Sequence, residues 1–326
     1  MARKKPPAPP SATAASASGW VEYEVTPTVG EVEVDLDETV PIQMPVRPPT
    51  DEEQQPKSGE VSPVFDLTEG VSFQPSAFPT AAASTARVGN TRLLPHSAVG
   101  KLIAHFNGAF GSGSAFVLGN RTVFTAAHCV DDNPTRIEFI PNVGPGDSNP
   151  TRRWKVKFSF VHRGYVASQN RDLRFDFAVC ITDPADDPVM PVTGSLGWLT
   201  VPHGQPDCTS IGYPSDPPRT NEFGFDGVQM WQSRGQFLRS DAPDLQGAHN
   251  DMTRGCSGGP WVVNLGFAGG WRAVGLNSHV RTFEDRIMWS PVFDDDFARM
   301  IKAVRDKELE LNGDTKPGDK NYIRLL

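Results

Sequence analysis

The most restrictive feature of the sequence is its texture from Val88 onward, where short apolar runs alternate with turns rich in Gly, Pro, Asn and Asp. The runs carry the β-branched and aromatic residues that favour strands, and almost no helical periodicity separates them. This hairpin-like spacing predicts an all-β domain, built as a barrel or a sandwich. The strand-like runs span residues 98–106, 114–118, 122–126, 136–140, 154–161, 177–181, 208–213, 229–238, 261–263, 271–277 and 287–291.

One clear helix is predicted, at the end of this domain. Phe293, Phe297, Ile301 and Val304 recur at three-to-four spacing, and acids precede bases along residues 294–307. This is the pattern of an amphipathic helix whose charges complement its dipole. Nothing after Lys307 is long enough for another domain, so residues 308–326 are expected to form a C-terminal tail.

Residues 1–86 differ in composition from the rest of the chain. They hold 13 of the 30 prolines, and their five basic and 13 acidic residues give a net charge of −8, the value of the whole chain. Such a segment does not build a core, so we expect a largely disordered, acidic arm in which part of 21–34 can pair as an edge strand. A solvated spacer, the removable propeptide of a zymogen and a partner-docking arm remain open as interpretations.

Charge and hydropathy limit the partners of the chain. Residues 87–326 carry 26 acidic and 26 basic residues, so no basic stripe predicts nucleic-acid binding. No run approaches the roughly 18 apolar residues of a membrane span. The positively charged start is not followed by the apolar core of a secretory signal, and we expect a cytoplasmic location or export by a leaderless route. The four cysteines are widely spaced, and we expect neither a metal nor a cofactor.

A glycine-rich turn contains the first candidate catalytic residue, Ser257, in the run Gly-Cys-Ser-Gly-Gly-Pro at 255–260. A serine hydroxyl is a poor nucleophile at neutral pH, and it needs a base beside it and N–H donors aimed at the oxyanion that forms. The N–H groups of Gly255 and Ser257 can form this oxyanion hole, and glycines let backbone and substrate approach closely. An ordinary Gly-Gly-Pro turn is the alternative interpretation.

Two further residues match the needs of this serine. His128 follows a predicted apolar strand in the run Thr-Ala-Ala-His-Cys at 125–129, where small residues can hold an imidazole rigidly. Asp176 lies inside the apolar run 175–179, and a buried carboxylate is costly unless something pairs with it. A hydrogen bond to His128 would fix the imidazole tautomer. Asp172 is a competing acid, but it lacks the following apolar run.

These motifs, in the order His, Asp, Ser, resemble those of the chymotrypsin-fold (trypsin-like) serine peptidases. The runs at 87–102, 111–116, 161–165 and 212–214 are similar to the bacterial V8-like, or glutamyl endopeptidase, branch, and the resemblance covers about residues 87–306. It implies two six-stranded antiparallel β-barrels within a peptidase domain spanning 87–307. It also implies that Ser257 is the nucleophile, His128 the general base and Asp176 the orienting acid. Ser278 matches the family serine that contacts this acid on the substrate-pairing strand.

The chain departs from the family pattern at its cysteines. Cys256 stands where trypsin-like members have the Asp that pairs with a newly cut N-terminus, so that activation route is absent. Cys256 is expected to be a small buried filler, with a redox-sensitive switch as the alternative. The family partners of Cys129 and Cys208 are also missing, so we expect an enzyme that does not depend on disulfides.

The resemblance places three further residues at the substrate. Asp251 occupies the position of the aspartate with which trypsin selects Arg or Lys, so charge pairing favours a basic side chain at P1, the residue before the cleaved bond. V8-like relatives also carry Asp there in a structural role. Glutamate-selective members have Thr and His where this chain has Met252 and Asn277, which argues against Glu selectivity.

The sequence therefore predicts a serine endopeptidase that acts on protein or peptide substrates through an acyl-enzyme. The alternative is a catalytically weak member of the fold that binds peptides by strand pairing. An esterase of the α/β-hydrolase type is disfavoured, because no helix directly follows the serine. The oligomeric state and the physiological substrate are left open.

Overall fold

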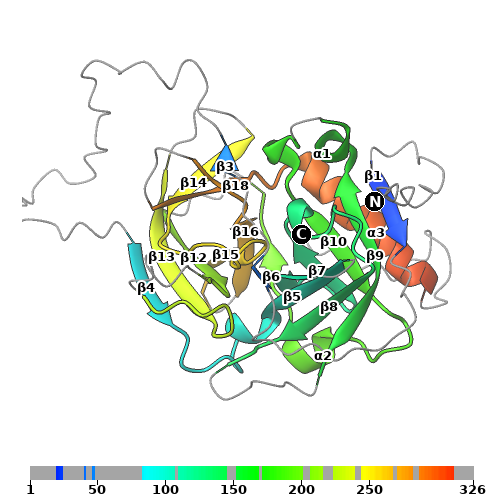
Figure 1. Cartoon of the computed structure of the whole chain (residues 1–326), viewed down its shortest axis with the longest axis horizontal. Helices are drawn as coiled ribbons and strands as arrows, with labels where there is room; N and C mark the ends of the chain where they lie inside the picture. Colours follow the sequence, from blue (N-terminus) through cyan, green and yellow to red (C-terminus); the bar gives the residue numbers. More distant parts are fainter. Residues whose placement is uncertain are drawn as a thin grey trace, which may run out of the picture.

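The computed structural model describes residues 20–24, 40–41, 46–47, 83–106, 109–144, 152–168, 171–200, 206–215, 223–238, 244–266, 270–281 and 286–311. Strands dominate this part of the chain, and they form two large sheets (Figure 1). The predicted all-β class is confirmed.

The first sheet contains a closed antiparallel barrel. Its strands follow the order β9, β10, β7, β6, β5, β8, and a further pairing of β8 with β9 closes the ring. The core inside is formed by alternating apolar residues of these strands, including the fully buried rings of Phe116, Phe124 and Phe139. The strands span Val99–Phe106 (β5), Ala109–Val117 (β6), Thr122–Thr125 (β7), Arg136–Pro141 (β8), Trp154–His162 (β9) and Ala178–Thr182 (β10).

The second sheet has the strand order β11, β16, β15, β12, β13, β14, β18, with β4 on the outer side of β13. Two barrels were expected, but here the structure shows a sheet: no ladder joins its end strands within the described residues. An isolated bridge between His279 and Trp289 links the run after β16 to β18. The strands span Ala83–Arg87 (β4), Gly197–Trp198 (β11), Asp207–Gly212 (β12), Trp231–Leu238 (β13), Leu245–His249 (β14), Pro260–Asn264 (β15), Trp271–Leu276 (β16) and Ile287–Pro291 (β18).

Part of the N-terminal segment forms short strands that pair with later parts of the chain, and one of them builds a separate two-stranded sheet with β17 (Val280–Arg281). Strand β1 (Trp20–Glu24) lies antiparallel to β9, and it overlaps the start of the range 21–34 where an edge strand was predicted. Strand β2 (Val40–Pro41) pairs in parallel with β6, and β3 (Val46–Arg47) pairs in parallel with β17. The rest of 1–82 lies outside the described residues, so the prediction of a disordered arm or propeptide is not addressed there.

Helix α3 (Asp295–Leu311) confirms the predicted C-terminal helix and extends it by four residues past 307. Asp294 begins the helix by accepting hydrogen bonds from the N–H groups of Asp296 (2.9 Å) and Phe297 (3.0 Å). Glu308 is buried, and it accepts from the Arg121 N–H (2.6 Å) and the Thr122 hydroxyl (2.8 Å) at the start of β7. The last turn is therefore ordered by the barrel, and residues 312–326 of the predicted tail lie outside the described residues.

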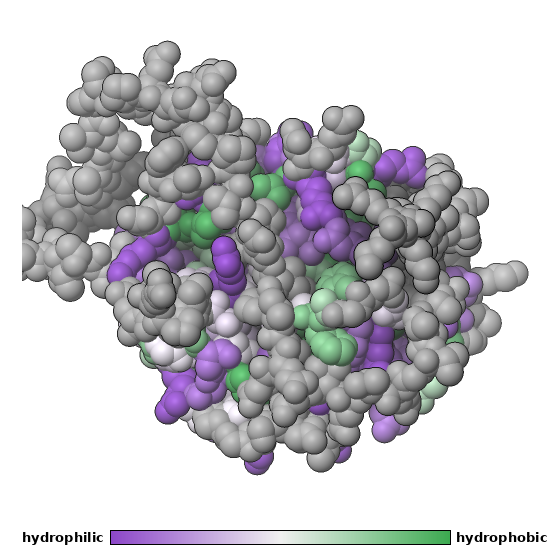
Figure 2. Space-filling model, viewed as in Figure 1, coloured by the Kyte–Doolittle hydropathy of each residue, from purple (hydrophilic) through white to green (hydrophobic). Residues whose placement is uncertain are grey.

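The remaining helical segments are single turns in the connections. They are η2 (His96–Ala98), η3 (Ala127–Cys129), α1 (Arg163–Ala167), η4 (Leu173–Phe175) and α2 (Met190–Thr193). Within the described part of the chain, no helix has the length and apolar character needed to cross a membrane. Hydrophilic and hydrophobic residues are interspersed on the face shown in Figure 2.

Candidate active site

The strand register of the barrel brings His128 and Asp176 together. Strands β7 and β10 are antiparallel with Thr125 opposite Ala178, so the residue two before Ala178 meets the turn that follows Thr125. His128 lies in that turn, η3, and Asp176 lies just before β10. Both side chains are buried.

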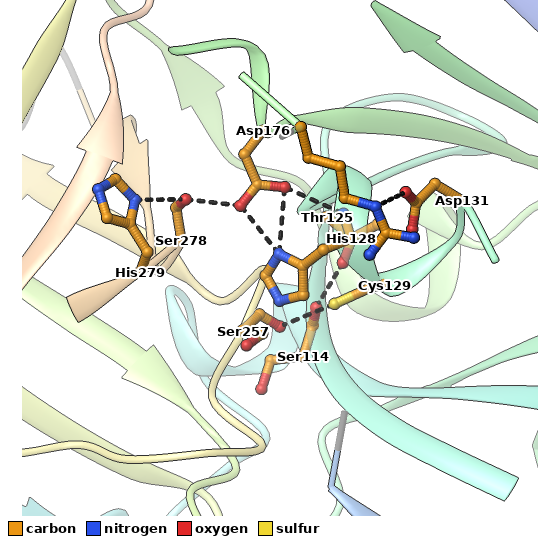
Figure 3. A network of polar contacts seen from close by, with 10 residues as sticks. Ser114, Thr125, His128, Cys129, Asp131, Asp176, Ser257, Ser278 and His279 are labelled. Atoms are coloured by element: carbon orange, nitrogen blue, oxygen red, sulfur yellow. Dashed lines mark hydrogen bonds and ion pairs between the residues drawn. The ribbon is translucent and has the colours of Figure 1, made fainter. Parts of the chain in front are cut away.

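Three groups donate hydrogen bonds to the Asp176 carboxylate (Figure 3). The backbone N–H of His128 lies 3.0 Å from Oδ1, and its ring Nδ1 lies 2.8 Å from Oδ2 and 3.1 Å from Oδ1. The Ser278 hydroxyl donates to Oδ2 at 2.5 Å. With Nδ1 donating to the carboxylate, Nε2 is left as the acceptor of a neutral imidazole. The arrangement fixes both the orientation and the tautomer of His128.

Burial and charge act in opposite directions on this pair. Burial alone would raise the pKa of Asp176, but the charge of His128 and the donated hydrogen bonds outweigh it and hold the pKa below its ordinary value of 3.8. Burial alone would lower the pKa of His128, but the negative charge of Asp176 raises it well above 6.5. The site therefore holds an ionised carboxylate beside an imidazole that takes up a proton more readily than a free histidine.

Ser257 lies in a turn whose conformation requires glycine. Gly255 and Gly258 have φ values of +89° and +82°, in the left-handed region that side chains with a Cβ disfavour. A Cβ at Gly258 would also lie 2.1 Å from Thr125 Oγ1 and 2.3 Å from the Ser114 carbonyl oxygen. The glycines therefore let the turn pack directly against the first barrel.

The turn is fixed to the strand that carries Ser114. The Ser257 carbonyl accepts from the Ser114 N–H at 2.7 Å, and the Cys129 thiol lies 3.8 Å from the same oxygen. The Ser114 hydroxyl donates to the Gly255 carbonyl at 2.9 Å and accepts from the Tyr213 N–H at 3.0 Å. These contacts place residue 257 beside the turn that carries His128 (Figure 3).

The two side-chain atoms predicted to react have no hydrogen-bond partner among the described residues. They are Ser257 Oγ and His128 Nε2, and both are buried. The N–H groups of Gly255 and Ser257 donate to no backbone carbonyl in the described part of the chain. The structure thus brings the three predicted residues together, with the His–Asp bond formed and the Ser–His bond not formed. Such catalytic bonds often tighten only in the substrate complex.

The residues predicted to contact the substrate are buried, and two of them, Asp251 and Asn277, have polar partners within the protein. Asp251 is buried; its Oδ2 accepts from the Thr85 hydroxyl at 2.7 Å, and its Oδ1 lies 3.4 Å from Nη1 of Arg286. Met252 is also buried. The buried amide of Asn277 accepts at Oδ1 from Ser210, Asn250 and Trp261, at 2.6, 3.2 and 2.8 Å, and donates from Nδ2 to the Cys256 carbonyl at 3.1 Å. The amide of Asn277 therefore joins strands β12 and β16 to the turn of Ser257.

Sequence reasoning did not assign roles to two residues near this site. Ser114 lies in the Gly-Ser-Gly-Ser run of 111–114, whose family resemblance was the only signal.

The second residue is Asp131, three residues after His128. Its Oδ2 lies 3.0 Å from Nε of Arg171, with which it forms an ion pair. Burial raises the pKa of Asp131 to about 6, against the opposing effect of Arg171. Asp131 is thus a further carboxylate beside the His128–Asp176 pair, and its pKa is shifted in the opposite direction from that of Asp176. The competing acid Asp172 instead pairs with Arg174 at 2.6 Å.

The cysteines are buried free thiols. Cys129, Cys180, Cys208 and Cys256 form no disulfide. Burial raises the pKa of the Cys256 thiol far above its ordinary value, so the reactive thiolate is strongly disfavoured there. Within the described residues, no cluster of three or more His, Cys, Asp or Glu side chains could hold a metal ion.

The chain is similar to known proteases. Residues 100–286 match the protein-family model described as Trypsin. The protease Anisep from Arthrobacter nicotinovorans is 21% identical with a TM-score of 0.53, over 66% of this chain and 100% of that one. The thermostable serine protease AL20 from an extremophilic microorganism is 24% identical with a TM-score of 0.53, and the match covers 64% of this chain and 96% of that one. A Glu endopeptidase is 21% identical with a TM-score of 0.55, and the match covers 68% of this chain and 96% of that one. No curated protein matches the sequence.

Proposed function

Because the chain belongs to the trypsin family and is a serine-type endopeptidase, we propose that it cleaves peptide bonds with Ser257 as nucleophile, His128 as general base and Asp176 as orienting acid. One observation carries this assignment. The His128 ring is held through Nδ1 by a buried carboxylate, while its Nε2 has no partner among the described residues and residue 257 lies alongside.

In the proposed reaction, Ser257 Oγ attacks the carbonyl carbon of the substrate and passes its proton to His128 Nε2. The N–H groups of Gly255 and Ser257 stabilise the oxyanion, and Asp176 stabilises the imidazolium. His128 then donates the proton to the leaving amine, which leaves an acyl-enzyme ester on Ser257. A water molecule, deprotonated by His128, hydrolyses this ester and restores the free hydroxyl.

We propose a weak preference for basic side chains at P1. Asp251 supplies the negative charge, and a charged P1 residue would have to compete with Arg286, whose Nη1 lies 3.4 Å from Oδ1 of Asp251. Replacement Arg286→Gln should therefore increase the ratio of kcat/KM for a Lys substrate to that for its matched Leu substrate. An unchanged ratio would contradict a role for Asp251 in P1 selection.

The proposed nucleophile is tested by turnover of a mixed peptide library at neutral pH. Replacement Ser257→Ala should abolish cleavage, because it removes the hydroxyl proposed to attack the substrate, and the neighbouring Ser278 hydroxyl is engaged by the Asp176 carboxylate. The neighbouring Cys256→Ala is the matched control and should keep activity, since its buried thiol takes no part in the reaction. Equal turnover by Ser257→Ala and the wild type would refute the assignment. Peptide binding without turnover by the wild type would indicate the catalytically weak peptide-binding module instead.

A further inference from the structure

Strand β3 of the N-terminal segment occupies the strand edge next to the proposed triad acid. It pairs in parallel with β17, with Val46 opposite Val280 and Arg47 opposite Arg281. Val280 follows Ser278 by two residues, a distance of about 7 Å along an extended chain. Ser278 is the residue whose hydroxyl donates to Asp176. Strand β3 therefore pairs with the run that directly follows Ser278.

Strand β2 occupies a second edge, on the side of the first barrel. Strand β6 pairs with β7 only at Phe116 and Val117, and further along the same strand β2 pairs with Gly111 and Ser112. Ser112 precedes Ser114 by two residues, and the Ser114 N–H holds the carbonyl of Ser257. The residue that pairs with β2 is thus two positions from Ser114, which contacts the turn of Ser257. In the same way, the residue that pairs with β3 is two positions from Ser278, which contacts Asp176.

The two short strands belong to one continuous piece of chain. Only residues 42–45 separate β2 from β3, so a single stretch joins an edge of the first barrel to β17, the short strand that follows Ser278. The proposed catalytic residues lie in the segments that adjoin these two places. An extended peptide binds a protein of this kind by adding a strand to an exposed edge, and both edges are already taken.

We propose that β2 and β3 are an internal competitor of the substrate, which inhibits the enzyme until a peptide displaces them; this inference rests on the function proposed above. Each ladder has only two residue pairs, and parallel pairs are slightly less stable than antiparallel ones. A peptide that pairs over a longer stretch would therefore displace them without cleavage of the arm. The proposed inhibition is therefore reversible, and the enzyme becomes active without removal of the arm.

The test removes the backbone donors of the two strands. The variant Val40→Pro, Val46→Pro, Arg47→Pro leaves β2 and β3 without N–H groups, since Pro41 already has none. If the arm blocks the site in about nine molecules of ten, this variant should have a KM about tenfold lower than the wild type at unchanged kcat. Proline substitutions at Gln54, Gln55 and Ser58 are the matched control and should change neither value.

Hydrogen exchange gives a second readout that does not depend on activity or on the folding of the proline variant. Excess substrate peptide added to the Ser257→Ala protein should accelerate amide exchange at Val46 and Arg47, because the peptide takes their place. Unchanged exchange, or an unchanged KM in a folded proline variant, would overturn the inference. If the wild type does not cleave peptides but exchange at these amides accelerates, the proposed function fails and the competition stands.

Discussion

At the scale of single residues, the site depends on how a buried carboxylate stays charged. Asp176 is completely buried, yet the His128 N–H, the His128 ring and the Ser278 hydroxyl all donate to it. These donors and the charge of His128 offset the cost of burial. The same carboxylate then makes His128 a stronger base than an isolated imidazole.

This coupling predicts the pH dependence of activity. In the proposed mechanism, neutral His128 is the form that accepts the proton of Ser257, and Asp176 raises the pKa of His128 well above 6.5. Activity should therefore rise with pH, and the midpoint of kcat/KM should lie above 6.5. A profile of kcat/KM from pH 5 to 10 measures this midpoint, and a value below 6.5 would contradict the coupling.

The matched pair Asp176→Asn and Asp172→Asn tests which acid orients His128. Asp176→Asn should lower kcat about ten-thousandfold, the usual effect of losing the correct imidazole tautomer. Asp172→Asn should leave kcat nearly unchanged, because Asp172 pairs with Arg174. The reverse order of the two effects would assign the role to Asp172.

The sequence predicted the triad candidates and Ser278, but it missed the partners of Asp251 for a physical reason. His128, Asp176 and Ser257 lie in short motifs whose composition reflects local needs: small residues, an apolar run and glycines. The partners of Asp251 are Thr85 and Arg286, which come from distant parts of the chain. Only the folded sheets bring them to Asp251, so no local pattern indicated that its charge is paired.

At the scale of elements, the turn of Ser257 is held by a strand of the other sheet. Ser114 on β6 bonds to three different segments, through its N–H, its hydroxyl and its carbonyl, which accepts from Thr125 at 2.8 Å. This single residue joins the first barrel to the turn and to the end of β12. The geometry of the proposed oxyanion hole therefore depends on the contact between the two sheets.

Replacement Ser114→Ala tests this connection. It leaves the Gly255 carbonyl and the Tyr213 N–H without their buried partner, so we expect a loss of roughly 1–3 kcal/mol in the free energy of unfolding. The value of kcat should also fall, because the turn of the oxyanion hole loosens. Urea unfolding and steady-state kinetics measure the two effects. Ser112→Ala, on the same strand, is the control, and equal effects of both substitutions would contradict the special role of Ser114.

The sequence predicted strands where apolar residues are dense. It did not predict strands that are defined only by hydrogen bonds to neighbouring strands. The first half of β6, with the sequence Ala-Phe-Gly-Ser-Gly at 109–113, has weak strand propensity, but β5 pairs along its whole length. Strand β14, with the sequence Leu-Gln-Gly-Ala-His, was not predicted, and it lies between β13 and β18. In both cases long-range hydrogen bonds override local preference.

At the scale of the whole molecule, helix α3 completes the core of the first barrel. The ring of Phe297 packs against Phe293 at 3.9 Å, Phe124 at 5.2 Å and Trp198 at 5.3 Å between centroids. Phe124 belongs to β7, the strand that leads into the turn of His128. The helix therefore supports the strand that leads to His128, the proposed general base.

Replacement Phe297→Ala should lower the free energy of unfolding by about 3–5 kcal/mol, the usual cost of deleting a buried aromatic ring. The control is Arg299→Ala on the exposed face of α3, where the loss of a surface pair with Asp296 should cost less than about 1 kcal/mol. Thermal or urea unfolding distinguishes the two. A similar small effect of both substitutions would show that the barrel is stable without this contact.

The covalent adduct formed by a fluorophosphonate probe tests the central assignment most directly. Mass spectrometry of the digested protein should find one adduct, on Ser257, which forms much more slowly in the His128→Ala protein and not at all in the Ser257→Ala protein. An adduct on another residue, or equal labelling of the wild type and the Ser257→Ala protein, would contradict the assignment.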